Sequence, residues 1–124
     1  MSAETAAPPV PVLLVDDHAA FRAAARLMLE SGGRFAVVAE AGTGEEAVQT
    51  ALALQPRLVL MDVRLPGIDG VEATRRIKEA LPGTVVVLMS THRPADLPPG
   101  LDECGAAAFQ RKEDVEPEAL LDVL

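Results

Sequence analysis

Residues 58–70 read LVLMDVRLPGIDG, and this stretch decides the fold. Its first five residues form an apolar run that ends at Asp62. A loop with Pro66 and Gly70 separates that run from VEATRRIKEAL (71–81), which has the pattern of an amphipathic helix. An apolar run without polar interruption is typical of a strand that is covered on both faces. The stretch therefore predicts one strand-to-helix step of a parallel sheet flanked by helices.

The same alternation of apolar run and amphipathic stretch extends to both sides of residues 58–70. Four more runs rich in Val, Leu and Ala predict strands, and they are VLLVD (12–16), FAVVAE (35–40), VVVLMS (85–90) and AAAFQ (106–110). Right-handed crossovers between successive strands place helices on both faces of such a sheet. We therefore expect an α/β fold with a five-stranded parallel sheet, whose ligand site lies beyond the carboxyl ends of the strands.

Helix-start and helix-stop residues lie between the predicted strands. Thr43 with Glu46, and Asp69 with Glu72, have the spacing of an N-terminal capping box. The first expected helix follows Asp17 and stops at the two glycines 32 and 33. Its apolar face is made of Phe21, Ala25, Met28 and Leu29.

One crossover lacks a helical pattern. The segment HRPADLPPGLDECG (92–105) contains three prolines and Gly100, and each proline inside a helix costs about 3 kcal/mol. We therefore expect a disrupted fourth helix, with at most a short helical turn in its place. The last helix begins near Glu116, and we expect it to be cut short at Leu124.

Composition favours one acidic domain in a reducing compartment. Residues 1–11 have no apolar period and predict a flexible leader, which leaves residues 12–124 as the folded domain. The 124 residues carry a net charge of −8, with no Trp and no Tyr, so we expect no nucleic-acid surface on this domain. No apolar run reaches the roughly 20 residues of a membrane span. A lone cysteine, Cys104, forms no internal disulfide and is typical of a cytoplasmic protein.

Polar residues follow the predicted strands at the point where each strand ends. Because parallel strands share one carboxyl edge, we expect these residues to converge there, and they are Asp16, Asp17, Asp62, Ser90 and Lys112. Two carboxylates about 4 Å apart repel by roughly 4 kcal/mol at an effective dielectric of 20, and one lysine does not offset three. An all-oxygen cluster of this kind favours Mg²⁺.

A magnesium site with one carboxylate left to react is a site for phosphoryl transfer. Asp62 is the candidate nucleophile, which would form an aspartyl phosphate, while Lys112 and the Ser90 hydroxyl would stabilise the phosphoryl oxygens. Thr91 offers a second hydroxyl beside Ser90, and we favour Ser90 as the hydroxyl that contacts the phosphoryl group. The spacing of His18, His92 and Cys104 matches no zinc pattern, and His18 is expected to start a helix.

Together these motifs resemble the receiver domain of bacterial two-component response regulators. The resemblance covers residues 12–124 and depends on LLVDDH (13–18), on LVLMDVRLPGIDG (58–70), and on Ser90 and Lys112 in that order. DDHAAFR (16–22) and GVEATRR (70–76) are most similar to receivers that precede LuxR-type helix-turn-helix domains. The resemblance implies a doubly wound, flavodoxin-like receiver fold.

The resemblance also implies a role for each site residue. Asp62 would accept a phosphoryl group from the phosphohistidine of a sensor histidine kinase. Mg²⁺ would be bound by Asp17, Asp62 and the backbone carbonyl of Arg64, with Asp16 helping through water. Ser90 would swing toward the new phosphoryl group, and Phe109 would turn inward into the space that it leaves. The Arg64 side chain could reach the phosphate, and we expect a β-branched Thr91 to slow hydrolysis.

The leading hypothesis is therefore a regulatory phosphoacceptor and not an enzyme that acts on external substrates, beyond phosphorylating itself and slowly losing the phosphate. Its expected partners are a histidine kinase and a second copy of the chain in a homodimer. DNA would be contacted only through a separate C-terminal output domain, and no membrane is expected. The alternative is an interaction module that keeps the receiver fold and signals without phosphorylation. A phosphatase that acts on external substrates is disfavoured, because it would need an Asp-x-Asp motif at the first strand, where this chain has the adjacent pair Asp16 and Asp17.

Overall fold

The computed structural model describes residues 7–91 and 97–124. The first half of the described chain forms β1 (Val10–Val15), α2 (Ala19–Glu30), β2 (Phe35–Ala41), α3 (Gly44–Leu54) and β3 (Leu58–Asp62). The second half forms α4 (Gly70–Ala80), β4 (Val85–Ser90), β5 (Ala108–Arg111), the 3₁₀ helix η2 (Lys112–Asp114) and α5 (Pro117–Leu121).

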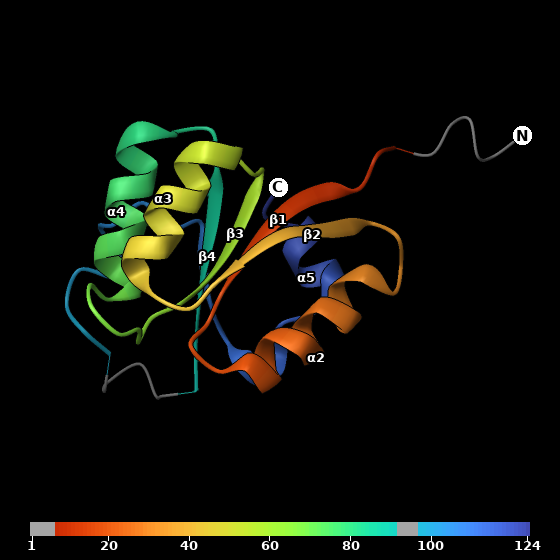
Figure 1. Ribbon diagram of the computed structural model, residues 1–124, viewed down its shortest axis with the longest axis horizontal. Helices are drawn as coiled ribbons and strands as arrows, with labels where there is room; N and C mark the ends of the chain where they lie inside the picture. Colours follow the sequence, from red (N-terminus) through yellow and green to blue (C-terminus); the bar gives the residue numbers. More distant parts are fainter. Residues whose placement is uncertain (1–6, 92–96) are drawn as a thin grey trace, which may run out of the picture.

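The five described strands form one parallel sheet in the order β2-β1-β3-β4-β5. Helices α3 and α4 cover one face of the sheet, and α2 and α5 cover the other (Figure 1). The strand order reverses between β1 and β3, which places the crevice of an open α/β sheet beyond their carboxyl ends. The predicted α/β fold class is confirmed.

Both faces of the central strands are buried, which explains their unbroken apolar runs. In β1, Leu13 and Val15 belong to the cluster under α3 and α4, while Val12 and Leu14 belong to the cluster under α2 and α5. All of β3 is buried in the same alternating way. Since successive strand side chains point to opposite faces, a strand between two helical layers needs apolar residues at every position.

The starts of α3 and α4 have the predicted side-chain caps. The Thr43 hydroxyl accepts a hydrogen bond from the Glu46 amide at 3.1 Å, and the Asp69 carboxylate accepts one from the Glu72 amide at 2.8 Å. The return bond of the first box is displaced by one residue, because the Glu46 carboxylate accepts from the Gly42 amide. Both caps hold the start of a helix against the carboxyl edge of the sheet.

Two strand boundaries differ from expectation. β1 begins at Val10, whose amide donates to the Arg34 carbonyl at 2.9 Å. Pro11 is tolerated because the pairing of β1 with β3 starts only at Val12, so the missing N–H of Pro11 leaves no gap in that ladder. β5 covers Ala108–Arg111, later than the predicted run 106–110, because a string of alanines gives no signal of where a strand starts.

No helix forms in residues 97–107, which lie between β4 and β5. They form turns, with positive φ at Gly100 and Gly105 and a hydrogen bond from the Glu103 amide to the Gly100 carbonyl. Buried Cys104 closes the turn with a bond from its thiol to the Leu101 carbonyl at 3.4 Å. The predicted disruption is confirmed for these residues, and 92–96 lie outside the described part of the chain.

The last predicted helix also forms as expected. Pro117 occupies the first turn of α5, and Leu120 on that helix is completely buried against the sheet. Within residues 7–91 and 97–124, none of the helices has both the length and the apolar character that crossing a bilayer requires.

Candidate functional site

Three carboxylates meet at the point where the strand order reverses. Asp16 and Asp17 follow β1, and Asp62 ends the neighbouring strand β3. Asp16 is completely buried and Asp62 is 5% exposed, while Asp17 lies open to solvent. One ligand atom from each of these residues and from His18 lies within 4.8 Å of all the others. The expected convergence of the β1 and β3 ends is therefore present.

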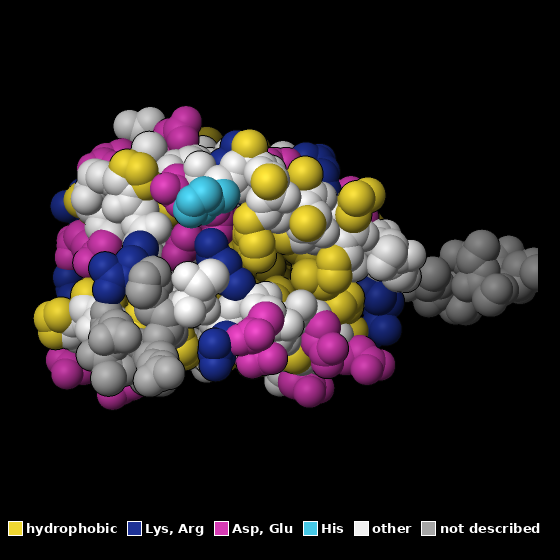
Figure 2. All heavy atoms as spheres, turned by 90° about the horizontal axis from the view of Figure 1, so that it is seen from below, with side chains coloured by type: hydrophobic (Ala, Val, Ile, Leu, Met, Phe, Trp, Pro, Cys, Tyr) yellow, Lys and Arg dark blue, Asp and Glu magenta, His cyan; other side chains and the backbone are white. Residues whose placement is uncertain are grey.

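Lys112 brings the one ammonium group of this cluster from the start of η2. Its Nζ lies 3.0 Å from Oδ2 of Asp62, and it also forms an ion pair with Oδ2 of Asp16. The lysine side chain is 11% exposed, so both ion pairs are largely shielded from water. Seen from below (Figure 2), acidic, basic and imidazole side chains lie side by side at this edge of the molecule.

Burial and charge act in opposite directions on the two partners. Burial raises the pKa of Asp62 above its ordinary value of 3.8, although the Lys112 ammonium and the Arg64 amide both act to lower it. Burial acts to lower the pKa of Lys112, but its hydrogen bonds to Asp16 and Asp62 outweigh that effect and raise the pKa above 10.5. Asp62 is thus an incompletely compensated carboxylate beside a firmly charged lysine.

The loop after β3 holds Asp62 through its own backbone. The Arg64 amide donates to Oδ1 of Asp62 at 3.1 Å, and the Gly70 amide donates to the Val63 carbonyl at 2.7 Å. A Cβ at position 70 would lie 2.1 Å from the Asp62 carbonyl oxygen. Only glycine fits there, so the loop closes tightly against the strand end that carries the candidate nucleophile.

A cleft of about 400 Å³ opens above Asp62. It is lined by Asp17, His18, Phe21, Asp62, Arg64, Thr91 and Lys112. The Arg64 side chain is exposed and lines this cleft, as the sequence-based hypothesis of a phosphate contact requires. The cleft gives a small anionic group access to the Asp62 carboxylate and to the Lys112 ammonium together.

The two candidate hydroxyls occupy different places. Ser90 ends β4 and is 1% exposed, whereas Thr91 is exposed and lines the cleft. Ser90 has the strand parity of Leu88, which belongs with Phe109 to the cluster under α3 and α4. Ser90 therefore shares a sheet face with Phe109, and Thr91 is part of the cleft wall.

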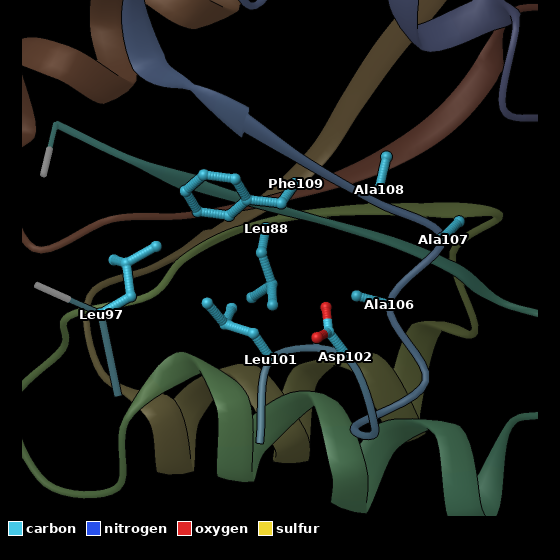
Figure 3. A pocket seen from close by; sticks show the side chains of 8 residues that line it. All are labelled: Leu88, Leu97, Leu101, Asp102, Ala106, Ala107, Ala108 and Phe109. Atoms are coloured by element: carbon cyan, nitrogen blue, oxygen red, sulfur yellow. The ribbon is translucent and has the colours of Figure 1, made fainter. Parts of the chain in front are cut away.

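Phe109 lies beside a cavity of about 330 Å³ on that same face, which Asp102 lines together with apolar side chains. Figure 3 shows its ring and the side chains of Leu88, Leu97 and Leu101 around one space, between β4, β5 and the turns that follow residue 97. The phenylalanine is half-buried. The cavity lies where a fourth crossover helix would otherwise cover the sheet.

Two residues at the site were not predicted to act there. Phe21 was assigned only to the buried face of its helix, yet Lys112 Nζ lies 4.5 Å from the centroid of its ring, within the range of a cation–π interaction. His18 is the N-cap of α2, as expected, but its ring also contacts Asp16 and Asp17. Their closeness to Asp17 in the sequence could have indicated this, because both lie within about one helical turn of that residue.

Comparisons with known proteins agree with this architecture. The protein-family model of the response regulator receiver domain matches residues 12–124 of this chain. The chain is similar to the response regulator UvrY of Escherichia coli (strain K12), with 40% identity over 101 residues that cover 82% of this chain and 46% of UvrY. It is equally similar to GacA of Pseudomonas viridiflava, with 40% identity over 82% of this chain and 47% of GacA. The chain thus spans about half the length of the curated relatives it matches.

Solved structures give the same answer for the fold. The signal receiver domain of NarL from Mycobacterium tuberculosis matches with a TM-score of 0.85 and 32% identity, over 94% of this chain and 96% of that domain. A LuxR-family two-component response regulator from Aurantimonas sp. SI85-9A1 matches with a TM-score of 0.80 and 32% identity, over 92% and 81% of the two chains. The resemblance to LuxR- and NarL-type receivers is confirmed, and the chain belongs to the response regulator receiver domain family.

Proposed function

We propose that this chain is a phosphoacceptor in which Asp62 takes a phosphoryl group from the phosphohistidine of a sensor kinase. The observation that supports this most strongly is the position of Asp62. Its carboxylate borders an open cleft, 3.0 Å from the Lys112 ammonium and within reach of two further aspartates. A lone reactive carboxylate among fixed charges is what phosphoryl transfer requires, since catalysis there is mainly positioning and charge stabilisation.

Mg²⁺ fits this donor set. Three carboxylates lie close together while the Lys112 ammonium compensates Asp16 and Asp62 only in part, as the raised pKa of Asp62 indicates. Asp16, Asp17, Asp62 and the backbone carbonyl of Arg64 would hold the ion, with Asp16 acting through water. When bound, Mg²⁺ would supply positive charge to the phosphoryl oxygens.

The proposed transfer forms one bond and breaks one bond. An oxygen of the Asp62 carboxylate forms the new P–O bond while the P–N bond of the phosphohistidine breaks, and its electron pair returns to the imidazole nitrogen. The Lys112 ammonium and the Ser90 hydroxyl stabilise the transferred oxygens, and the Arg64 side chain adds a further donor from the cleft wall. Thr91 borders the same space and hinders the water that would hydrolyse the product.

The signal leaves the site through Ser90 and Phe109. Both lie on the sheet face under α3 and α4, and the cavity next to Phe109 gives the ring room to turn inward once Ser90 moves. The resulting change at β4 and β5 alters contacts with a second copy of the chain or with an output domain. DNA is contacted only through such a separate domain, and the chain acts as a cytoplasmic regulator and not on external substrates.

Intact-mass spectrometry tests the proposal. Incubation with Mg²⁺ and acetyl phosphate should add the mass of one phosphoryl group, and Asp62→Asn should abolish the gain. Asp122→Asn, at an exposed aspartate beside α5, is the matched control and should leave the gain unchanged. No gain with acetyl phosphate or with a phosphorylated kinase would favour the alternative, an interaction module that signals without phosphate.

A further inference from the structure

A guanidinium group on α2 braces the end of β1. Arg22 Nη1 donates a hydrogen bond to the backbone carbonyl of Asp16, and its Nε donates to Oε1 of Glu40 on β2 at 2.9 Å. The Arg22 and Glu40 side chains are 22% and 28% exposed, so their ion pair is partly shielded from water. We propose that Arg22 is a positioning residue, which sets the orientation of the peptide between Asp16 and Asp17 and with it the geometry of the acidic site.

The Asp16 carbonyl lies where the ladder between β1 and β2 ends. The Asp16 amide still donates to the Ala41 carbonyl at 3.0 Å, but the last paired residues of the two strands are Val15 and Ala41. Because a peptide unit is planar, a donor that fixes this carbonyl also fixes the amide of Asp17. The two carboxylates project from the Cα atoms on either side of that unit. The direction in which each of them points therefore depends on the bond from Arg22.

Glu40 holds the Arg22 side chain in this position. Its second carboxylate oxygen accepts from Nη1 of Arg26 at 2.7 Å, so both oxygens are occupied and the carboxylate plane is fixed. The two arginines lie about one helical turn apart on the same face of α2. Since a guanidinium is a rigid planar fork, fixing Nε of Arg22 aims its Nη1 at the Asp16 carbonyl. The Glu40 carboxylate also offsets the charge of Arg22, so this residue supplies position to the acidic site and not net charge.

Arg26 makes the same kind of contacts away from the acidic site. Its Nη2 donates to the Val37 carbonyl at 3.0 Å, on the edge strand β2. Each arginine thus shares Glu40 and donates to one backbone carbonyl, but only the carbonyl bound by Arg22 belongs to a residue of the site. Arg26→Ala is therefore a matched control for the loss of an ion pair together with a carbonyl contact.

Calorimetric titration of the full chain with Mg²⁺ is the first test, because the inference rests on the magnesium site of the proposed function. Arg22→Ala should weaken Mg²⁺ binding about tenfold, the lower end of the loss when a residue that orients a metal ligand is removed. Arg26→Ala should bind Mg²⁺ as the wild type does. Arg22→Lys keeps the charge but not the planar fork, so it should recover little of the affinity. Full recovery with lysine would contradict a positioning role.

An NMR measurement in EDTA reports on the peptide itself and needs neither Mg²⁺ nor phosphorylation. In ¹H–¹⁵N spectra, Arg22→Ala should shift the amide resonance of Asp17, whose nitrogen belongs to the same peptide as the Asp16 carbonyl. Arg26→Ala should instead shift the resonance of Val38, which follows the carbonyl that Arg26 binds. An Asp17 resonance that stays in place in Arg22→Ala would overturn the inference.

The titration also separates this inference from the proposed function. Unchanged Mg²⁺ affinity in Arg22→Ala, or equal losses in both alanine variants, would overturn the role of Arg22 while the mass gain at Asp62 remains intact. Failure of the wild type to bind Mg²⁺ would overturn the proposed magnesium site and this inference together. Urea unfolding checks that both alanine variants are folded under the titration conditions, and Arg22→Gln takes the place of Arg22→Ala if that variant is not.

Discussion

The ammonium of Lys112 lies 3.0 Å from the carboxylate of Asp62, although Asp62 ends β3 and Lys112 follows β5, two strands that are not neighbours in the sheet. The same ammonium also pairs with Asp16, so one lysine at the end of β5 compensates the ends of β1 and β3. Removing Lys112 would leave the buried carboxylates of Asp16 and Asp62 without this compensating positive charge. The stability of the metal-free protein should therefore depend strongly on Lys112.

Lys112→Met should destabilise the metal-free protein by about 3 kcal/mol, the lower end for a buried ion pair that loses one partner. The measurement is urea unfolding in the presence of EDTA. Lys112→Arg keeps the charge and should lose much less. Adding Asp62→Asn to Lys112→Met should recover part of the loss, and two fully additive substitutions would argue against the coupling.

The raised pKa of Asp62 predicts a pH-dependent stability in the absence of metal. A folded-state pKa above the unfolded value of 3.8 means that ionisation of Asp62 costs folding free energy. That cost is absent below about the unfolded pKa and complete above the folded one. Asp62→Asn should therefore be no more stable than wild type at low pH and should gain stability over it as the pH rises through this window. A difference in unfolding free energy between variant and wild type that stays constant at all pH values would contradict the raised pKa of Asp62.

Phe21 should act on Lys112 through its ring face. Phe21→Leu keeps an apolar side chain but removes the cation–π contact, worth about 0.5–1 kcal/mol, so the rate of phosphorylation by acetyl phosphate should fall about two- to fivefold. Phe21→Trp should retain most of the rate. Met28→Leu, at another half-buried position of α2, controls for packing. If the leucine and tryptophan variants react equally fast, the ring face has no role.

Gly70 should not tolerate a side chain. A Cβ at this position meets the backbone of Asp62 and Val63, so Gly70→Ala should cost about 1–3 kcal/mol and displace the strand end that carries Asp62. Gly83→Ala is the matched control, because nothing lies within 4 Å of its Cβ. Thermal unfolding of both variants checks the prediction, and equal melting temperatures would refute it.

Much of the fold and site follows from the sequence, because burial on both faces leaves a plain signal. The central runs Val12–Val15, Leu58–Met61 and Val85–Met89 are apolar at every position since two helical layers cover them, and the polar residues that follow them must then share one edge. The start of β1 was predicted two residues too late, because Pro11 was expected to precede the strand. A proline is acceptable inside β1 at this position because the pairing with β3 has not yet begun there.

Contacts that depend on helix rotation could not be predicted. The sequence assigned Phe21 to the buried side of its helix, but only the packing of α2 against the sheet decides that the ring reaches Lys112. The same holds for His18, whose position before the helix says nothing of its contacts with Asp16 and Asp17. Likewise, the cavity beside Phe109 depends on how the turns after residue 97 cross the sheet.

The central claim is that Asp62 forms the acyl phosphate, and borohydride trapping tests it most directly. After incubation with Mg²⁺ and acetyl phosphate, reduction by borohydride converts a phosphorylated aspartate to homoserine, which peptide mass spectrometry then locates. We predict homoserine at position 62 and at no other aspartate. Homoserine at Asp16 or Asp17, or none anywhere despite a measured gain in mass, would contradict the account.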